Sequence, residues 1–372
     1  MKETDFLNKL NQSPLFKLSL SSKELFHSNF LWWLGNNERT FPLFKCIMEK
    51  FTGQCLSWDY GNISIEREKK HFDLCIKDAR SGRLLLILEN KVKSIPGLSQ
   101  LENYKNKDPQ ADNYVLLSLV MDFPKKDEME ETDWKVYNYK DLHDALLKDV
   151  PIDATIYEKE LISDYSVFIY SLHQLVQCWK REVTDDQPFV QKRNPKIEEC
   201  RLHDLYDKLR FSQLALMLQN QLNHTGVDVN MGYSNQSGIL DVTIKCREYE
   251  LMIQVQGNSY RHACVWKSKN RKDCDTLWQQ ILSDKTISQL KFLTCSGTLF
   301  GSDIFQEGIY PIDNSKRGKQ YNMFIGRNYV FLYQSRQLRT GITIGQLLEN
   351  IRNEVENICS NITENAETLE RE

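Results

Sequence analysis

Residues 83–92 read RLLLILENKV, a run of five apolar residues that ends in Glu89, Asn90 and Lys91. An apolar run without alternation predicts a central strand of a sheet that is covered on both faces. Side chains two apart on a strand point to the same face, so Glu89 and Lys91 are expected to project together. A charge buried without a partner is costly. We therefore expect a functional site at the end of this strand.

Secondary structure is predicted on both sides of the central strand. The alternation in 62–70 (NISIEREKK) and the apolar run in 71–78 (HFDLCIKD) predict two strands before it. After it, a polar helix is predicted over 98–107, a buried strand over 113–120 (NYVLLSLV) and a short strand over 134–139 (WKVYNY).

Helices complete the first half of the chain. A helix is expected over 24–34 (ELFHSNFLWWL), opened by a capping box from Ser21 to Glu24, and another over 41–51 with Pro42 in its first turn. Two more are expected over 141–149 and 152–180. The resulting order, α-β-β-β-α-β, predicts an α/β fold with a central mixed sheet.

The second half predicts a separate α+β region. Residues 182–198 are polar and contain two prolines, which is typical of a linker. We expect one domain over 1–181 and a second region over 199–372, with a helix over 199–222, strands over 227–265 and a final helix over 343–359. Asp241, Gln254 and Gln256 echo the layout of the first half, so a degenerate repeat is an alternative, although any two consecutive strands can produce such an echo.

Composition excludes several classes of protein. The net charge is −3 and the pI about 6.2, which disfavours a simple polycation that coats nucleic acid. No apolar stretch has the roughly 20 residues that a membrane span needs. The ten cysteines form no CxxC pair and the histidines no HExxH or HxxxH spacing, so we expect reduced thiols, no zinc site and a cytoplasmic protein without membrane contact.

Asp73 joins Glu89 and Lys91 in a set that suits phosphodiester hydrolysis. Asp73 lies among apolar residues of the strand predicted before the central one. Two carboxylates from adjacent strands can hold Mg²⁺ through oxygen ligands at roughly 2.1 Å. Such a metal polarises a phosphate and activates a bound water, and a lysine on the same face can offset the charge of the transition state.

These motifs resemble those of the PD-(D/E)xK nuclease superfamily. The resemblance rests on Asp73, on Glu89-Asn90-Lys91, on the preceding 24–34 helix and on a following QLxxY at 100–104. It spans roughly residues 20–120 and is closest to a bacterial branch with ELFHSxFLxWL, D…ENK and QLxxY motifs. Phe72 stands where the family name has Pro, a small departure in a loosely patterned superfamily.

The resemblance implies a role for each matching residue. Asp73 and Glu89 would bind the metal, together with the backbone carbonyl of Asn90, and Glu24 would reach the metal or its water shell. Lys91 would orient or activate the attacking water. Gln100 would act in the same site, with Tyr104 four residues on contacting nucleic acid from the same helix face.

The preferred hypothesis is a Mg²⁺-dependent nuclease acting on DNA rather than RNA, with Mn²⁺ as a substitute and bacterial defence as its setting. The second region would then recognise substrate or partner, and a homodimer stays open. Basic residues among aromatics suggest further nucleic-acid contacts, although an ordinary solvated surface explains them equally well: Arg261, Lys267, Lys269 and Arg271.

Other interpretations stay open. A catalytically silent nucleic-acid-binding or regulatory protein could keep the same fold, and an interaction protein could carry an acidic cluster that binds nothing. Glu89 and Lys91 could form an ion pair on a solvated strand edge. Glu24 could serve only the start of its helix, and His27 could be a packed core histidine.

Overall fold

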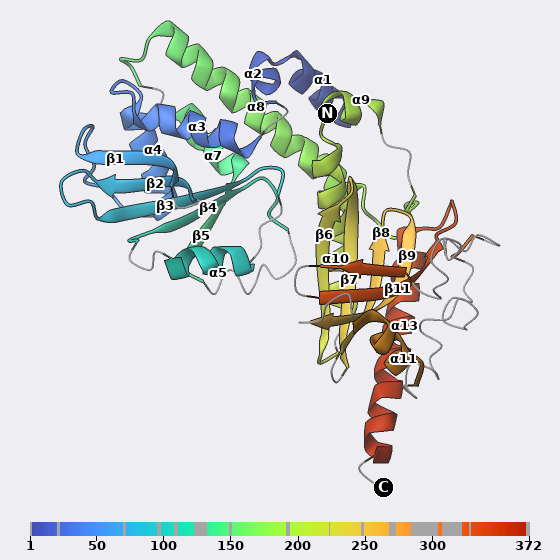
Figure 1. The fold of residues 1–372 in the computed structure, drawn as a ribbon. Coiled ribbons are helices and arrows are strands. Elements are labelled where there is room, and N and C mark those ends of the chain that lie inside the picture. The colour runs from blue at the N-terminus through green and yellow to red at the C-terminus, as the bar shows by residue number, and fades with distance from the viewer. Residues whose placement is uncertain are drawn as a thin grey trace. The chain divides into compact units, whose positions relative to one another are not determined.

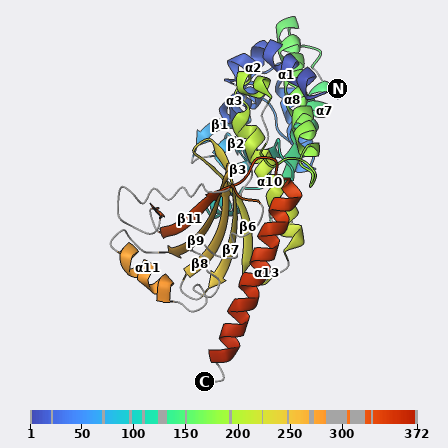
Figure 2. The same cartoon turned by 90° about the vertical axis from the view of Figure 1, so that its right-hand side faces the viewer.

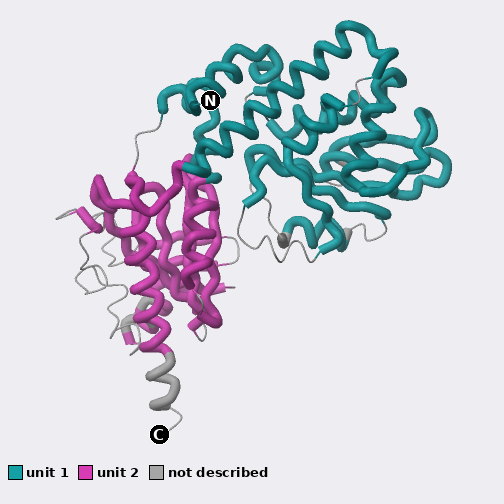
Figure 3. The backbone as a smooth tube through the Cα atoms, turned by 180° about the vertical axis from the view of Figure 1, so that it is seen from behind, with its two compact units in different colours: residues 1–181, 193–209 teal, residues 182–192, 210–372 magenta. Residues whose placement is uncertain are grey.

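The protein is described here by a computed structural model that divides into two compact units (Figure 3). Unit 1 comprises residues 1–181 and 193–209, and unit 2 comprises residues 182–192 and 210–372. The structure describes the residues 2–20, 23–69, 72–94, 98–107, 111–122, 132–148, 151–190, 194–222, 224–246, 249–267, 273–283, 304–306, 322–326 and 329–369.

Unit 1 alternates helices and strands in the predicted order. Its helices are α1 (Glu3–Gln12), α2 (Pro14–Leu18), α3 (Glu24–Gly35), α4 (Phe41–Thr52), α5 (Leu98–Lys107), α7 (Tyr139–Lys148), α8 (Ile156–Arg181), α9 (Pro195–Glu199) and the start of α10 (His203–Gln221). Its strands are β1 (Ile63–Lys69), β2 (Phe72–Asp78), β3 (Leu84–Lys91), β4 (Tyr114–Ser118) and β5 (Trp134–Asn138).

The five strands form one mixed sheet in the order β1-β2-β3-β4-β5. β1, β2 and β3 pair antiparallel, whereas β4 is parallel to β3 and β5 is parallel to β4. The parallel step from β3 to β4 passes through α5, as a parallel connection requires. The predicted α/β class and the restriction-endonuclease-like α-β-β-β-α-β order are confirmed, with the apolar strand in the centre.

Helices cover both faces of this sheet (Figure 1). The larger core lies on one face, where side chains of α3, α4, α7 and α8 pack on the sheet. The smaller core lies on the opposite face beneath α5, and it includes Leu101 and Tyr104. Two covered faces explain why β3 carries no polar residue before its end.

The alternation of β3 separates the residues at its end. Leu86 and Leu88 belong to the larger core, and Ile87 belongs to the core under α5. Because strand side chains alternate, Asn90 continues the face of Leu88, whereas Glu89 and Lys91 continue the face of Ile87.

Unit 2 contains a six-stranded antiparallel sheet in the order β10-β11-β9-β8-β7-β6. Its strands are β6 (Val227–Ser234), β7 (Ser237–Cys246), β8 (Tyr249–Gln256), β9 (Ser259–Lys267), β10 (Asn322–Ile325) and β11 (Tyr329–Gln337). Side chains of α10 and α13 (Ile344–Leu369) pack with those of the sheet. Figure 2 shows α13 running alongside the sheet, and α11 spans Cys274–Ser283. Strands β7 and β8 lack the parallel crossover that follows β3, so the described part of unit 2 does not repeat the topology of unit 1.

Several predicted boundaries differ from the structure. α3 begins at Glu24 with Lys23 as its N-cap, so the cap predicted at Ser21 lies too early, and Ser21 itself is outside the described residues. The segment predicted as a linker contains α9, and its two ends belong to different units. α13 continues to Leu369, well past the expected end at Cys359. The assignment of functions to the two domains stays a prediction.

The described ranges contain neither a membrane-spanning helix nor a disulfide bond. None of the helices there is long and apolar enough to cross a membrane. The nine cysteines in those ranges form no disulfide bond with one another.

The start of α8 is held by Glu158, which accepts hydrogen bonds from several donors. The backbone N–H of Thr155 donates at 2.7 Å, and the guanidinium of Arg39 donates to both carboxylate oxygens at 3.1 Å. The hydroxyl of Thr155 in turn accepts from the Glu158 N–H at 3.2 Å, which completes a capping box. The bonds from Arg39, followed by those from Thr155, lower the pKa of Glu158 to about 2.

Glu158→Gln is expected to lower the melting temperature at pH 7 by a few degrees, because the amide keeps fewer acceptor sites for Arg39 and Thr155. The folded pKa is depressed, so this stabilisation is present above the unfolded value of 4.5 and is lost as pH falls toward 2. Thermal unfolding followed by circular dichroism at pH 7 and pH 3.5 measures it. Glu160→Gln, two residues along the same helix and exposed, is the control; an equal effect of both variants would contradict the capping role.

Candidate active site

Asp73 and Glu89 lie side by side on the sheet face beneath α5. Leu74 of β2 pairs with Leu88 of β3, so the antiparallel register brings Asp73 and Glu89 next to each other. Asp73 Oδ2 accepts a 2.7 Å hydrogen bond from the backbone N–H of Asn90. Glu89 is only 2% exposed. Two like charges on directly neighbouring strand positions destabilise a sheet unless something offsets them.

The pKa values of both carboxyl groups report this strain. Burial raises the pKa of Asp73 to about 6, against the opposing effect of the Asn90 hydrogen bond. Burial also raises the pKa of Glu89 to about 7, and the negative charge of Asp73 adds to the increase. Pairs of carboxyl groups with raised pKa values are typical of catalytic and metal-binding sites.

Lys91 supplies the cation on the same face. Its Nζ donates a 2.7 Å hydrogen bond to Glu89 Oε1, and both side chains are almost fully buried. The interpretation of this pair as a solvated edge contact is therefore wrong. Burial lowers the pKa of Lys91, but the attractions of Glu89, Glu24 and Asp73 together outweigh burial and the net shift is upward. The ammonium is thus charged at neutral pH, which makes it a hydrogen-bond donor rather than a base.

Glu24 reaches the loop that follows β3. Its Oε1 accepts hydrogen bonds from the backbone N–H groups of Val92, at 3.1 Å, and Ser94, at 3.2 Å, and from the Ser94 hydroxyl. Its charge also contributes to the raised pKa values of Asp73 and Glu89. The charge of Glu24 therefore acts on the two site carboxyl groups. Its Oε1 is bonded to the loop after β3, whereas its Oε2 makes no bond to that loop.

Gln100 and Tyr104 lie on α5 and are brought to the same face. Gln100 Nε2 donates to the Tyr104 hydroxyl at 2.7 Å, and the Tyr104 ring packs edge-on against Phe72 at 5.2 Å. Burial and then the charge of Glu89 raise the pKa of Tyr104. The structure thus collects all the residues that the sequence motifs selected in unit 1, although the roles given to them stay predictions.

His27 is a residue of the hydrophobic core. His27 is fully buried, contacts the Tyr165 hydroxyl at 2.9 Å through Nδ1, and has a pKa lowered by burial to about 3, so it is a neutral core residue.

Glu68 was missed by the sequence analysis. It lies opposite Asp73 in β1, has the left-handed φ of +50°, and adds to the negative charge around Asp73. The alternation of residues in the sequence did not indicate that Glu68 would lie near Asp73.

The donor set fits a divalent cation of the magnesium type. Glu89 Oε2 is buried and has no hydrogen-bond partner in the structure. In the neighbouring Asp73, Oδ2 accepts from Asn90, and Oδ1 is the oxygen that this bond does not use. Among the described residues, no three acidic, histidine or cysteine side chains converge as a complete metal cage. Mg²⁺ needs no such cage, because it usually keeps several waters and takes one or two carboxylates. The Asn90 carbonyl and Glu24 remain predicted further ligands.

Comparison with known proteins agrees with this geometry. Residues 15–167 match the model of the PD-(D/E)XK nuclease superfamily. Over this stretch the chain is similar to that superfamily. The match contains the mixed sheet and all the unit 1 site residues discussed above. No match was found among curated proteins or among solved structures.

Of the four basic residues proposed for nucleic-acid contact in unit 2, two lie among the described residues. Arg261 Nη1 donates to Gln254 Oε1 at 2.5 Å, and its guanidinium lies 5.1 Å from the centre of the Tyr333 ring. Lys267 is exposed and pairs with Glu250 at 2.5 Å. Lys269 and Arg271 lie outside the described residues. Nucleic-acid contact by these four residues stays a prediction.

Asp73→Asn is expected to stabilise the metal-free protein, because the amide removes a buried charge and still accepts from Asn90. The folded pKa of about 6 exceeds the ordinary value of 3.8. The gain is therefore absent below about pH 4, grows up to pH 6 and is constant above it, at about 1–3 kcal/mol. Denaturant unfolding in EDTA at pH 4 and pH 8 measures the difference.

Asp78→Asn provides the matched control at the other end of β2. The backbone N–H and hydroxyl of Ser81 lower the pKa of Asp78, so this substitution should destabilise the protein at pH 8. Opposite signs for the two variants are expected. A loss of stability in Asp73→Asn at pH 8 would show that the carboxylate is not a source of strain.

Proposed function

We propose that unit 1 is a divalent-metal-dependent nuclease that hydrolyses phosphodiester bonds in DNA. The observation that carries the proposal is the pair of buried carboxyl groups, Asp73 and Glu89, with raised pKa values and an unpaired Glu89 oxygen beside a charged Lys91. An ordinary structural ion pair would not retain a second buried acid next to it.

The residues divide the work of hydrolysis among them. Asp73 and Glu89 would hold the metal, with Mg²⁺ preferred and Mn²⁺ as a substitute. When bound, the metal supplies Lewis-acid stabilisation of the phosphate and a more acidic water. Lys91 would donate a hydrogen bond toward the attacking water or a phosphate oxygen as negative charge develops there. The water oxygen forms a bond to phosphorus while the bond to the leaving sugar oxygen breaks.

The wider setting is part of the same proposal. Similarity to a nuclease superfamily supports nucleic acid as the substrate. The preference for DNA and the role in bacterial defence follow the motif resemblance, and the cytoplasmic location follows the expectation from composition. Unit 2 would recognise substrate or partner. A silent binding protein is the alternative, and it is disfavoured because it has no need of the costly carboxyl pair.

The decisive measurement is nicking and linearisation of plasmid DNA with Mg²⁺ or Mn²⁺, alongside a single-stranded DNA and an RNA substrate. Lys91→Ala is expected to reduce the rate about 100-fold or more, because one transition-state donor is lost. Its control is Lys77→Ala, which removes an ion pair of the same sheet, with Glu66 at 2.5 Å. Lys77→Ala should cleave like the parent.

Metal binding is tested separately by thermal unfolding with Ca²⁺ or Mg²⁺. The parent should melt at a higher temperature with metal, and Asp73→Ala and Glu89→Ala should lose this shift. Lys91→Ala should keep it. Metal-insensitive melting of the parent would refute the metal site, and binding of DNA without cleavage would favour the silent binding protein.

A further inference from the structure

Asn90 connects three parts of unit 1 from the opposite face of β3. Its side chain is fully buried. Nδ2 donates to the backbone carbonyl of Glu24 at 3.1 Å, Oδ1 accepts from the Tyr139 hydroxyl, and the backbone N–H donates to Asp73 Oδ2 at 2.7 Å. One residue therefore joins the first turn of α3, the first residue of α7 and a carboxylate of the active site.

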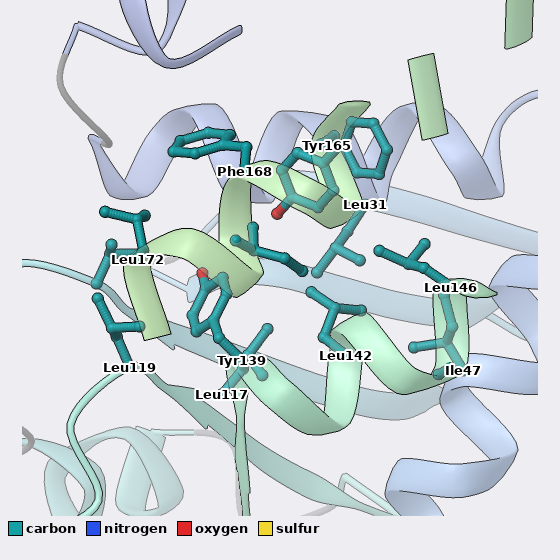
Figure 4. Close-up of a cluster of buried hydrophobic side chains, with 14 of the residues drawn as sticks. Leu31, Ile47, Leu117, Leu119, Tyr139, Leu142, Leu146, Tyr165, Phe168 and Leu172 are labelled. Atoms are coloured by element: carbon teal, nitrogen blue, oxygen red, sulfur yellow. The ribbon is translucent and has the colours of Figure 1, made fainter. Parts of the chain in front are cut away.

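Tyr139 holds the Asn90 amide from its oxygen side. Its ring is fully buried among the side chains in Figure 4, and its hydroxyl donates to Asn90 Oδ1. A backbone carbonyl can only accept, so Nδ2 must face the carbonyl of Glu24. Oδ1 is then the amide atom that accepts from Tyr139.

From this geometry we propose that Tyr139 is a positioning residue of the metal site, acting through Asn90. The inference rests on the proposed function. With its amide bonded at both ends, Asn90 cannot rotate in β3, and its backbone N–H stays directed at Asp73. That bond engages Asp73 Oδ2, so Oδ1 is the oxygen it leaves for a metal. Supporting partners of this kind orient metal ligands, and their loss typically lowers metal affinity about 10–100-fold.

Tyr165 offers a matched control within the same core. Like Tyr139 it is fully buried, and its hydroxyl has a raised pKa. It is labelled in the same cluster of side chains in Figure 4. Its hydroxyl contacts His27 Nδ1 at 2.9 Å rather than Asn90. Removing either hydroxyl deletes one buried hydrogen bond, so both changes should reduce stability, whereas only one of them touches the chain of contacts to Asp73.

The experiment measures Mn²⁺ affinity by isothermal titration calorimetry in the full chain, without substrate. Tyr139→Phe is expected to raise Kd about 10-fold, whereas Tyr165→Phe should stay within about twofold of the parent. Asn90→Ala should give a loss similar to that of Tyr139→Phe, and the double variant should be no worse than Asn90→Ala alone, because both act through one contact.

Each outcome separates this inference from the proposed function. Equal Mn²⁺ affinities for Tyr139→Phe and the parent, with the parent binding metal normally, would overturn the positioning role and leave the nuclease proposal intact. Absence of Mn²⁺ binding in the parent would refute both. If Tyr139→Phe fails to fold, Asn90→Ala decides alone: parental affinity in that variant would overturn the inference.

Discussion

Two carboxyl groups held next to each other in a buried sheet form the constraint on which the rest of unit 1 depends. Asp73 and Glu89 repel each other, and burial adds to the cost of ionising either of them. Lys91 offsets one charge through one oxygen of Glu89. The other oxygen has no partner in the structure. The fold thus sacrifices local stability at this point, as sites built for function commonly do.

The sheet is suited to hold such a pair rigidly. A strand whose side chains alternate can present a carboxylate and an ammonium on one face while the residue between them fixes the backbone from the other face. In β3 these tasks fall to Glu89 and Lys91 on one face and to Asn90 on the opposite one. Helices on both sides exclude water, so each hydrogen bond acts in a less polar medium, where electrostatic effects are stronger.

The central strand and the motif residues could be predicted from sequence because both depend on short-range patterns. A run of apolar residues ending in charges is visible locally, and so is the spacing of Gln100 and Tyr104. Contacts between distant segments leave no such pattern. Tyr139 was predicted as the end of a strand, yet it begins α7 and contacts Asn90. Glu68 came close to Asp73 only through strand register and a left-handed backbone.

The division of the chain into units has a consequence for how the protein can be dissected. Ile197, Leu202 and Leu205 belong to the larger core of unit 1, although residues 182–192 before them belong to unit 2. A protein ending at residue 181 would leave that core open and expose apolar surface. Unit 1 can therefore not be separated intact by a single cut after residue 181.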